Sequence, residues 1–328
     1  MPLDQREKPR FPSPSIALTL VLTAFAGMRI IGRCWRVLFP VTVDSVNARY
    51  VEILAGQCLL FAAPAAFYLL RSRAKTSVMR IRALPMGACF CLLLAGVSSV
   101  FAIGILTAFW AFLLDMLSIP LVSTGIPIPG NANELWLALL VIGMTPALCE
   151  ELLFRGLLLP SLERLGTRCA LLLSGLLFAL MHGQITALPA HLLLGFVLGL
   201  LLVGYGSLLA PMIFHATYNG AAMLLSYAQQ SLDPGQIGET AGKTHALSVT
   251  ELAANALPVL LVTGLTAGAL IWLPMRLAAR KNSPILHKPS GERLPLEARA
   301  LLVMLLVYFL IEYGRNIYAV TSFAGVAL

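Results

Sequence analysis

Long apolar runs separated by short polar stretches form the main pattern along this chain. The runs cover about 16–28, 50–70, 84–114, 134–160, 168–187, 188–205, 207–228, 251–275 and 296–312. Each run after the first is close to or above the ~20 residues that a helix needs to cross a bilayer. The pattern therefore predicts an all-α fold, a polytopic transmembrane helix bundle of about eight to nine helices, with eight if one run is re-entrant.

The composition agrees with this pattern and excludes a soluble protein. Of the 328 residues, 59% are hydrophobic and only 12% are charged, and the mean hydropathy is +0.85; soluble domains are less apolar. The formal net charge of +8 comes from Lys and Arg residues that cluster between the apolar runs. Such clusters are typical of membrane proteins, so we expect contact with the lipid bilayer and none with nucleic acid.

The distribution of Lys and Arg predicts the orientation, because loops rich in these residues stay on the cytoplasmic side. The loops at 71–82 and 276–293 are rich in them, whereas 115–134 has none and 229–250 has only Lys243. Alternation of these loops places the N-terminus in the cytoplasm, with the arginines between 33 and 49 as the exception. We expect a multi-pass protein of the plasma (inner) membrane.

The first apolar run has two interpretations. An uncleaved first helix is the one we prefer. Ala24-Phe-Ala26 also has the small residues of a signal-peptidase site, so removal of this run is the alternative.

Two adjacent carboxylates interrupt the run at 134–160, and Arg155 follows them. A charge at the bilayer centre costs ~3 kcal/mol, so an ionisable residue there indicates a function. Glu151 and Arg155 are at i and i+4 with the acid first, the favoured geometry of a helical ion pair, and Glu150 points about 100° away. We therefore predict that Glu151 and Arg155 pair, and that Glu150 acts on a water molecule.

Helix geometry predicts that an imidazole lies at the depth of these acids. The run with the acids and the next run form a helical hairpin with its apex near Gly166, provided that Pro160 kinks the helix without ending it. Glu150 and His182 lie at nearly equal distances along the chain from this apex. Acid and imidazole should therefore meet.

His215 and Asn219 lie one helical turn apart on one face. If this face points toward Glu150 and His182, the four side chains form a polar catalytic pocket inside the membrane. Such a set suits amide hydrolysis, because a carboxylate beside an imidazole can take a proton from water and return it to the leaving amine. His215 and Asn219 can donate hydrogen bonds to the oxyanion, worth ~3–4 kcal/mol per donor.

A metal site is the alternative to a site without a cofactor. One carboxylate and two imidazoles are a known zinc set, here Glu150, His182 and His215. The chain lacks a His-Glu-x-x-His pattern, and the three candidate ligands come from separate helices. Zinc therefore stays the less favoured interpretation.

Other features have structural interpretations. His191, beside Pro189, is expected to make an interhelical hydrogen bond. Gly195-x-x-x-Gly199 and Gly264-x-x-x-Gly268 predict close helix packing, because glycines let backbones approach.

Three short motifs carry a family resemblance: Glu150-Glu151-x-x-x-Arg155, Phe178-x-x-x-His182 and His215-x-x-x-Asn219. In order and spacing they resemble the CAAX-protease and bacteriocin-processing (CPBP, or Abi) membrane proteins, the family of the Ras-converting CAAX endopeptidase. The resemblance implies a glutamate-type intramembrane endopeptidase, a class earlier described as metalloproteases. It implies that Glu150 and His182 activate water, that His215 and Asn219 form the oxyanion pocket, and that Glu151, Arg155 and Phe178 support them.

The resemblance covers about 134–228, so we expect a catalytic core there, between N-terminal helices at 1–133 and an outer loop with C-terminal helices at 229–328. The implied substrate is a membrane-anchored protein or peptide: a CAAX-type tail, a bacteriocin or pheromone precursor, or a C-terminal sorting helix. A non-enzymatic immunity or scaffold protein and a proton-coupled transporter are the alternatives. A proton relay would place ionisable groups at several depths, whereas these share one.

Overall fold

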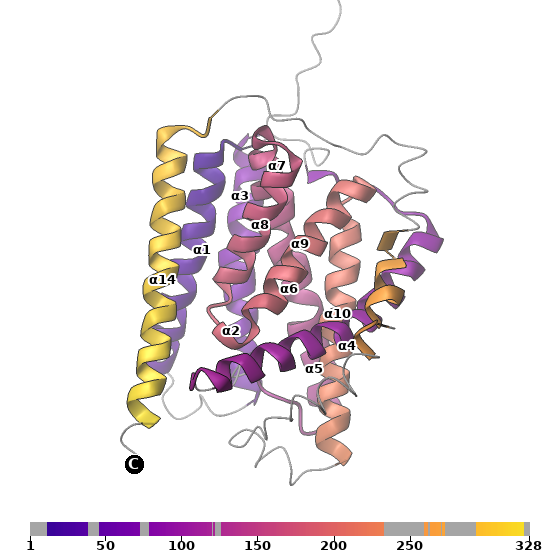
Figure 1. Cartoon of the computed structure of the whole chain (residues 1–328). Coiled ribbons are helices and arrows are strands. Elements are labelled where there is room, and N and C mark those ends of the chain that lie inside the picture. Colours follow the sequence, from indigo (N-terminus) through magenta and orange to yellow (C-terminus); the bar gives the residue numbers. More distant parts are fainter. Residues whose placement is uncertain are drawn as a thin grey trace, which may run out of the picture.

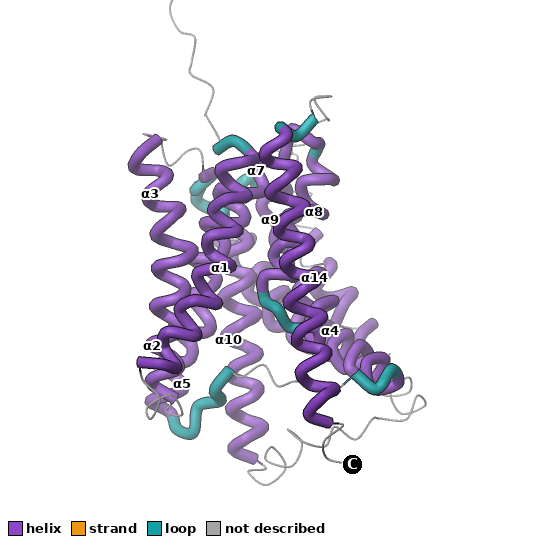
Figure 2. Tube along the Cα trace, turned by 90° about the vertical axis from the view of Figure 1, so that its left-hand side faces the viewer, coloured by secondary structure: helices purple, strands orange, loops and turns teal. Residues whose placement is uncertain are grey.

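The computed structural model describes residues 12–38, 46–72, 79–119, 121, 126–232, 259–261, 263–269, 271–272 and 293–324. Their regular elements are all helices, and no strand occurs among the described residues (Figures 1 and 2). The expected all-α class is confirmed. In chain order the elements are α1 (Pro14–Leu38), α2 (Val46–Gln57), η1 (Cys58–Ala62), α3 (Ala63–Ser72), α4 (Met86–Met116), α5 (Ala132–Ala138), η3 (Leu139–Met144), α6 (Thr145–Glu151), η4 (Leu152–Leu158), α7 (Leu159–Leu162), η5 (Glu163–Leu165), α8 (Thr167–Met181), η6 (Ile185–Ala187), α9 (Leu188–Tyr205), α10 (Leu209–Leu232) and α14 (Leu296–Ala324).

Five stretches of helix among the described residues are long and apolar enough to cross a membrane, which makes the chain a multi-pass membrane protein. The run expected at 168–187 is a shorter helix of 15 residues, α8. Most of the run at 251–275, most of the basic loop at 276–293, and Lys243 lie outside the described residues. The total of eight to nine spans therefore stays a prediction. The five spans are Pro14–Trp35, Val46–Arg71, Met86–Met116, Ala132–Leu165 and Ile185–Tyr205.

Three π-helical turns share a local cause. Each of η1, η3 and η4 directly precedes an α segment whose second residue is a proline: Pro64, Pro146 and Pro160. Proline has no N–H and its ring crowds the carbonyl four residues before it, so the regular i→i−4 ladder opens at that point. The helix nevertheless continues from Ala132 to Leu165, which confirms that Pro160 does not end it.

The hairpin after this long helix forms as expected. The chain turns at Gly166, whose φ of 88° favours glycine, and α8 and α9 then pack closely. A Cβ at Gly195 would lie 2.9 Å from the carbonyl oxygen of Gly175, which confirms the predicted close approach. A Cβ at Gly264 or Gly268 would meet no described atom within 4 Å, so for these two glycines close packing stays a prediction.

Three connections gather at the end of the bundle near Gly166. Arg80, one of the basic residues of the predicted loop at 71–82, is buried and donates from both terminal nitrogens to Glu163, at 2.8 and 2.6 Å. The N–H of Leu208 donates to the carbonyl of Arg80, and the hydroxyl of Ser207 to that of Arg82. The segments before α4, before α8 and before α10 are thus joined. At one edge of the bundle, α14 lies beside α1 (Figure 1).

Candidate active site

The residues of the three motifs come from adjacent elements that the long helix and the hairpin bring together. Glu150 and Glu151 end α6, Arg155 lies in η4, Phe178 lies in α8 with His182 directly after it, and His215 and Asn219 lie in α10. A cavity of about 920 Å³ is lined by four of them together with residues from α1, α2 and α9. The four are Glu150, His182, His215 and Asn219.

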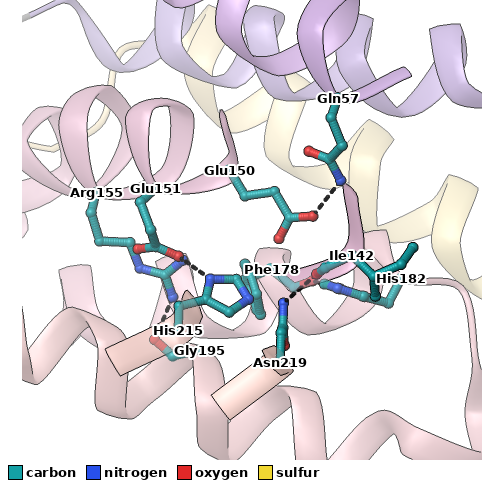
Figure 3. A network of polar contacts seen from close by, with 10 residues as sticks. All are labelled: Gln57, Ile142, Glu150, Glu151, Arg155, Phe178, His182, Gly195, His215 and Asn219. Atoms are coloured by element: carbon teal, nitrogen blue, oxygen red, sulfur yellow. Dashed lines mark hydrogen bonds and ion pairs between the residues drawn. The ribbon is translucent and has the colours of Figure 1, made fainter. Parts of the chain in front are cut away.

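Glu151 and Arg155 form the ion pair expected from their spacing. Nη1 of Arg155 lies 3.1 Å from Oε1 of Glu151, and neither side chain is exposed. The same carboxylate oxygen lies 2.9 Å from Nδ1 of His215, and Nη2 of Arg155 donates to the carbonyl of Gly195 at 2.7 Å (Figure 3). Charge-assisted hydrogen bonds of this kind are about twice as strong as neutral ones. The pair therefore ties α6 and η4 to both α9 and α10.

Phe178 is the aromatic centre of this cluster. The guanidinium carbon of Arg155 lies 4.5 Å from the centroid of its ring, a cation–π distance. The rings of His182 and His215 lie 4.8 and 5.9 Å from it, centroid to centroid. The ring of Phe178 thus packs against three other motif residues.

Glu150 has a different environment from its neighbour. Its residue surface is 5% exposed, and Oε1 accepts a hydrogen bond of 2.8 Å from Nε2 of Gln57. The second oxygen, Oε2, has no hydrogen-bond partner among the described residues. Figure 3 shows this carboxylate directed toward the region between His215, His182 and Asn219.

The tautomers of the two histidines follow from their partners. Nδ1 of His182 lies 2.9 Å from the carbonyl oxygen of Phe178, and Nδ1 of His215 contacts Glu151. Because a carbonyl and a carboxylate only accept, both Nδ1 atoms carry the hydrogen and donate. In each neutral ring, Nε2 is then the acceptor.

Asn219 is held by the backbone of η3. Its Nδ2 donates to the carbonyl of Ile142 at 3.3 Å. Pro146, four residues after Ile142, has no N–H to offer this carbonyl. The proline thus leaves an acceptor that orients the amide.

The zinc interpretation is not supported. Among the described residues, no group of three or more His, Cys, Asp or Glu side chains could hold a metal ion.

Two lining residues were not expected at the site. Gln57 is a polar residue in the apolar run at 50–70, which was the only indication in the sequence, and 93 residues separate it from Glu150. His191 was expected to make an interhelical hydrogen bond, but its buried Nδ1 has no hydrogen-bond partner among the described residues. Its ring stacks on that of His182, with centroids 3.9 Å apart and planes inclined by 19°. Both depend on tertiary contacts that no local spacing predicts.

Comparison with known families gives one match. Residues 132–221 match the family described as type II CAAX prenyl endopeptidase Rce1-like. The matched stretch begins at the first residue of α5 and ends in α10 just after Asn219, so it contains all three motifs. No curated protein and no solved structure matches the chain. The chain thus contains, over residues 132–221, a domain of the Rce1-like type II CAAX prenyl endopeptidase family.

Proposed function

We propose that this chain is a glutamate-type intramembrane endopeptidase that hydrolyses a peptide bond in a membrane-associated protein or peptide. The family match implies a protease with a protein substrate. One observation carries the mechanism: the buried Glu150 carboxylate lines the cavity, and one of its oxygens has no partner among the described residues.

Water activation falls to Glu150 and His182. Oε2 of Glu150 takes the proton of the attacking water and returns it to the leaving amine, as general base and then general acid. Nε2 of His182, the acceptor of its ring, receives a hydrogen bond from the same water and orients it. The contact of Nδ1 with Phe178 holds this tautomer.

Oxyanion stabilisation falls to Asn219 and His215. One amide hydrogen of Asn219 is used on Ile142, and the second is directed to the oxyanion. His215 donates from Nε2 only when its ring carries two protons, since Nδ1 already donates to Glu151. The Glu151 carboxylate compensates the charge of that imidazolium, and Arg155 and Phe178 hold the carboxylate and the ring in place.

Further parts of this proposal rest on the sequence. We place the catalytic core at 134–228, flanked by helices at 1–133 and 229–328, and the protein in the plasma (inner) membrane with a cytoplasmic N-terminus. The substrate is a membrane-anchored CAAX-type tail, a bacteriocin or pheromone precursor, or a C-terminal sorting helix. The proposed reaction uses protein side chains and no metal ion or organic cofactor.

The test uses the purified chain in vesicles. It measures cleavage of three membrane-anchored reporters, one from each of these substrate classes. Glu150→Gln keeps the shape of the side chain and removes the base, so it should lower kcat by roughly 10²- to 10⁴-fold. Glu297→Gln is the matched control, because Glu297 is exposed at the start of α14. Wild-type rates in Glu150→Gln would overturn the mechanism.

Proton-coupled transport is tested in the same vesicles. Cleavage that depends on Glu150, without a proton flux, supports the protease. A Glu150-dependent proton flux in vesicles that cleave no reporter would overturn it in favour of transport.

A further inference from the structure

Gln57 reaches the site from outside the matched residues 132–221. It is the last residue of α2 and directly precedes the π turn η1, which packs against α6. Its Nε2 lies 2.8 Å from Oε1 of Glu150 (Figure 3). Gln57 also lines the cavity, and its own Oε1 is buried without a hydrogen-bond partner among the described residues.

We propose that Gln57 is a positioning residue that holds Oε1 of Glu150 and leaves Oε2 directed into the cavity. The proposal rests on the proposed function, because it gives Glu150 the role of the base. It also assigns a part in the reaction to α2, which lies outside the family domain.

The chemistry of the donor distinguishes the two adjacent acids. Glu151 is held by the permanent cation of Arg155 and by Nδ1 of His215, and it does not line the cavity. Glu150 receives a neutral amide instead. An amide hydrogen bond stabilises the ionised form and orients it, and it leaves the carboxylate able to take a proton.

Without this donor, Glu150 would be a buried carboxylate whose two oxygens both lack a partner among the described residues. Burial of an unpaired charge is unfavourable, and the group responds by taking up a proton and becoming neutral. Its side-chain torsions would also be free to turn Oε2 away from the cavity. Both effects remove the base without touching the substrate.

The first experiment compares Gln57→Met, which keeps the length of the side chain and removes the donor, with Gln57→Asn, which keeps the donor on a shorter chain. Gln57→Met should lower kcat about 10- to 100-fold, the range of a hydrogen bond to a charged group. KM should stay unchanged, and the kcat of Gln57→Asn should lie between those of wild type and Gln57→Met. Gln229→Met, at an exposed position of α10, is the control and should cleave at wild-type rates.

A double-variant cycle distinguishes this positioning role from a role that is only structural. In the Glu150→Gln background, Gln57→Met should lower the residual rate no further, because no base is left for Gln57 to position. If Gln57→Met lowered the rate by the same factor in the wild-type and Glu150→Gln backgrounds, the proposal would be overturned. A wild-type kcat in Gln57→Met would also overturn it.

The second experiment does not need protease activity. Dicyclohexylcarbodiimide, a hydrophobic reagent, modifies protonated carboxyl groups, and mass spectrometry of the peptide locates the adduct. Gln57→Met should increase labelling at Glu150 several-fold over wild type, with no change at Glu151 or in Gln229→Met. Unchanged labelling at Glu150 overturns the proposal. If wild type cleaves no reporter, the proposed function falls, and the labelling result still decides whether Gln57 controls Glu150.

Discussion

Glu151 holds one carboxylate oxygen between two donors in the interior of the bundle. Oε1 lies 3.1 Å from Nη1 of Arg155 and 2.9 Å from Nδ1 of His215, and the acid and the guanidinium are both fully buried. Removing two charges from water costs several kcal/mol, and their attraction offsets this only while both partners are present. The cluster therefore stabilises the fold as a unit.

We expect Arg155→Met to destabilise the chain by about 3–5 kcal/mol, because it leaves the Glu151 carboxylate buried without its cation. The double variant Glu151→Gln/Arg155→Met should lose less than the sum of the single variants. Denaturant unfolding in micelles measures this. Arg315→Met is the control: that side chain is 66% exposed beside Glu312, so a loss below ~1 kcal/mol is expected. Additive losses would show that the buried pair does not act as a unit.

His191 stacks on His182 and restricts the movement of its ring. We expect His191→Ala to lower kcat roughly 2- to 10-fold, the range of one aromatic contact. His191→Phe keeps a ring for stacking and should retain most of the rate. Kinetics on the cleaved reporter measure both variants. If phenylalanine were as harmful as alanine, the nitrogen atoms of His191 would matter, and not its stacking.

At the scale of elements, prolines set the shape of the helix that carries the acids. Pro146 follows the π turn η3 and cannot donate to the carbonyl of Ile142, the group that receives the Asn219 amide. A π turn holds one residue more than an α turn, so it changes the direction in which later side chains point by about 100°. The proline thus affects both the acids and Asn219.

Pro146→Ala should restore an N–H that competes with Asn219 for Ile142, and it should relax η3 toward regular α-helix. We expect cleavage to fall about tenfold or more, as for loss of one oriented donor, while circular dichroism shows the helical content retained. Pro189→Ala is the control, because Pro189 lies in the first turn of α9 after a 3₁₀ turn. Wild-type cleavage by Pro146→Ala would contradict this role of the proline.

The contact between α8 and α9 leaves no room for a side chain at Gly195. A Cβ there would lie 2.9 Å from the oxygen and 3.0 Å from the Cα of Gly175, both backbone atoms. Gly195→Ala must therefore move α9 and lengthen the bond from Arg155 to the Gly195 carbonyl, now 2.7 Å. We expect a loss of ~1–3 kcal/mol in unfolding free energy, typical of overpacking, together with reduced cleavage.

Gly104→Ala is the control for this variant. A Cβ at Gly104, within α4, meets no described atom within 4 Å. Alanine there should leave stability unchanged or raise it by up to ~1 kcal/mol, since glycine disfavours helix interiors. Equal effects at Gly195 and Gly104 would show that the close approach is unimportant.

At the scale of the whole molecule, the local periodicity of the sequence predicted those features that depend on residues close together in the chain. Apolar runs predicted helices, and i, i+4 spacing predicted the pair of Glu151 and Arg155. Two contacts between distant segments were not predicted. Gln57 meets Glu150 across 93 residues, and Arg80, which resembled a loop charge, is buried against Glu163 across 83 residues. Such contacts depend on how helices pack, which no local pattern encodes.

The orientation of the chain in the membrane remains a prediction. Contacts between the loops are consistent with the predicted alternation of these loops between the two sides. The connections before α4, α8 and α10, which alternation assigns to one side, are joined by hydrogen bonds. On the positive-inside rule, the arginines before α4 predict that this end faces the cytoplasm. Cys169 is exposed near the start of α8 at this end, and Cys34 is exposed near the end of α1, which the alternation places outside.

Two variants that each retain one of the six cysteines test this orientation with a membrane-impermeant thiol reagent. In intact bacterial cells expressing the chain, the variant with only Cys34 should be labelled. The variant with only Cys169 should be labelled only after the membrane is opened. The reverse pattern would place the N-terminus outside and turn the bundle over. Labelling of both cysteines from one side would contradict the alternation itself, because the three spans between Cys34 and Cys169 should place them on opposite sides.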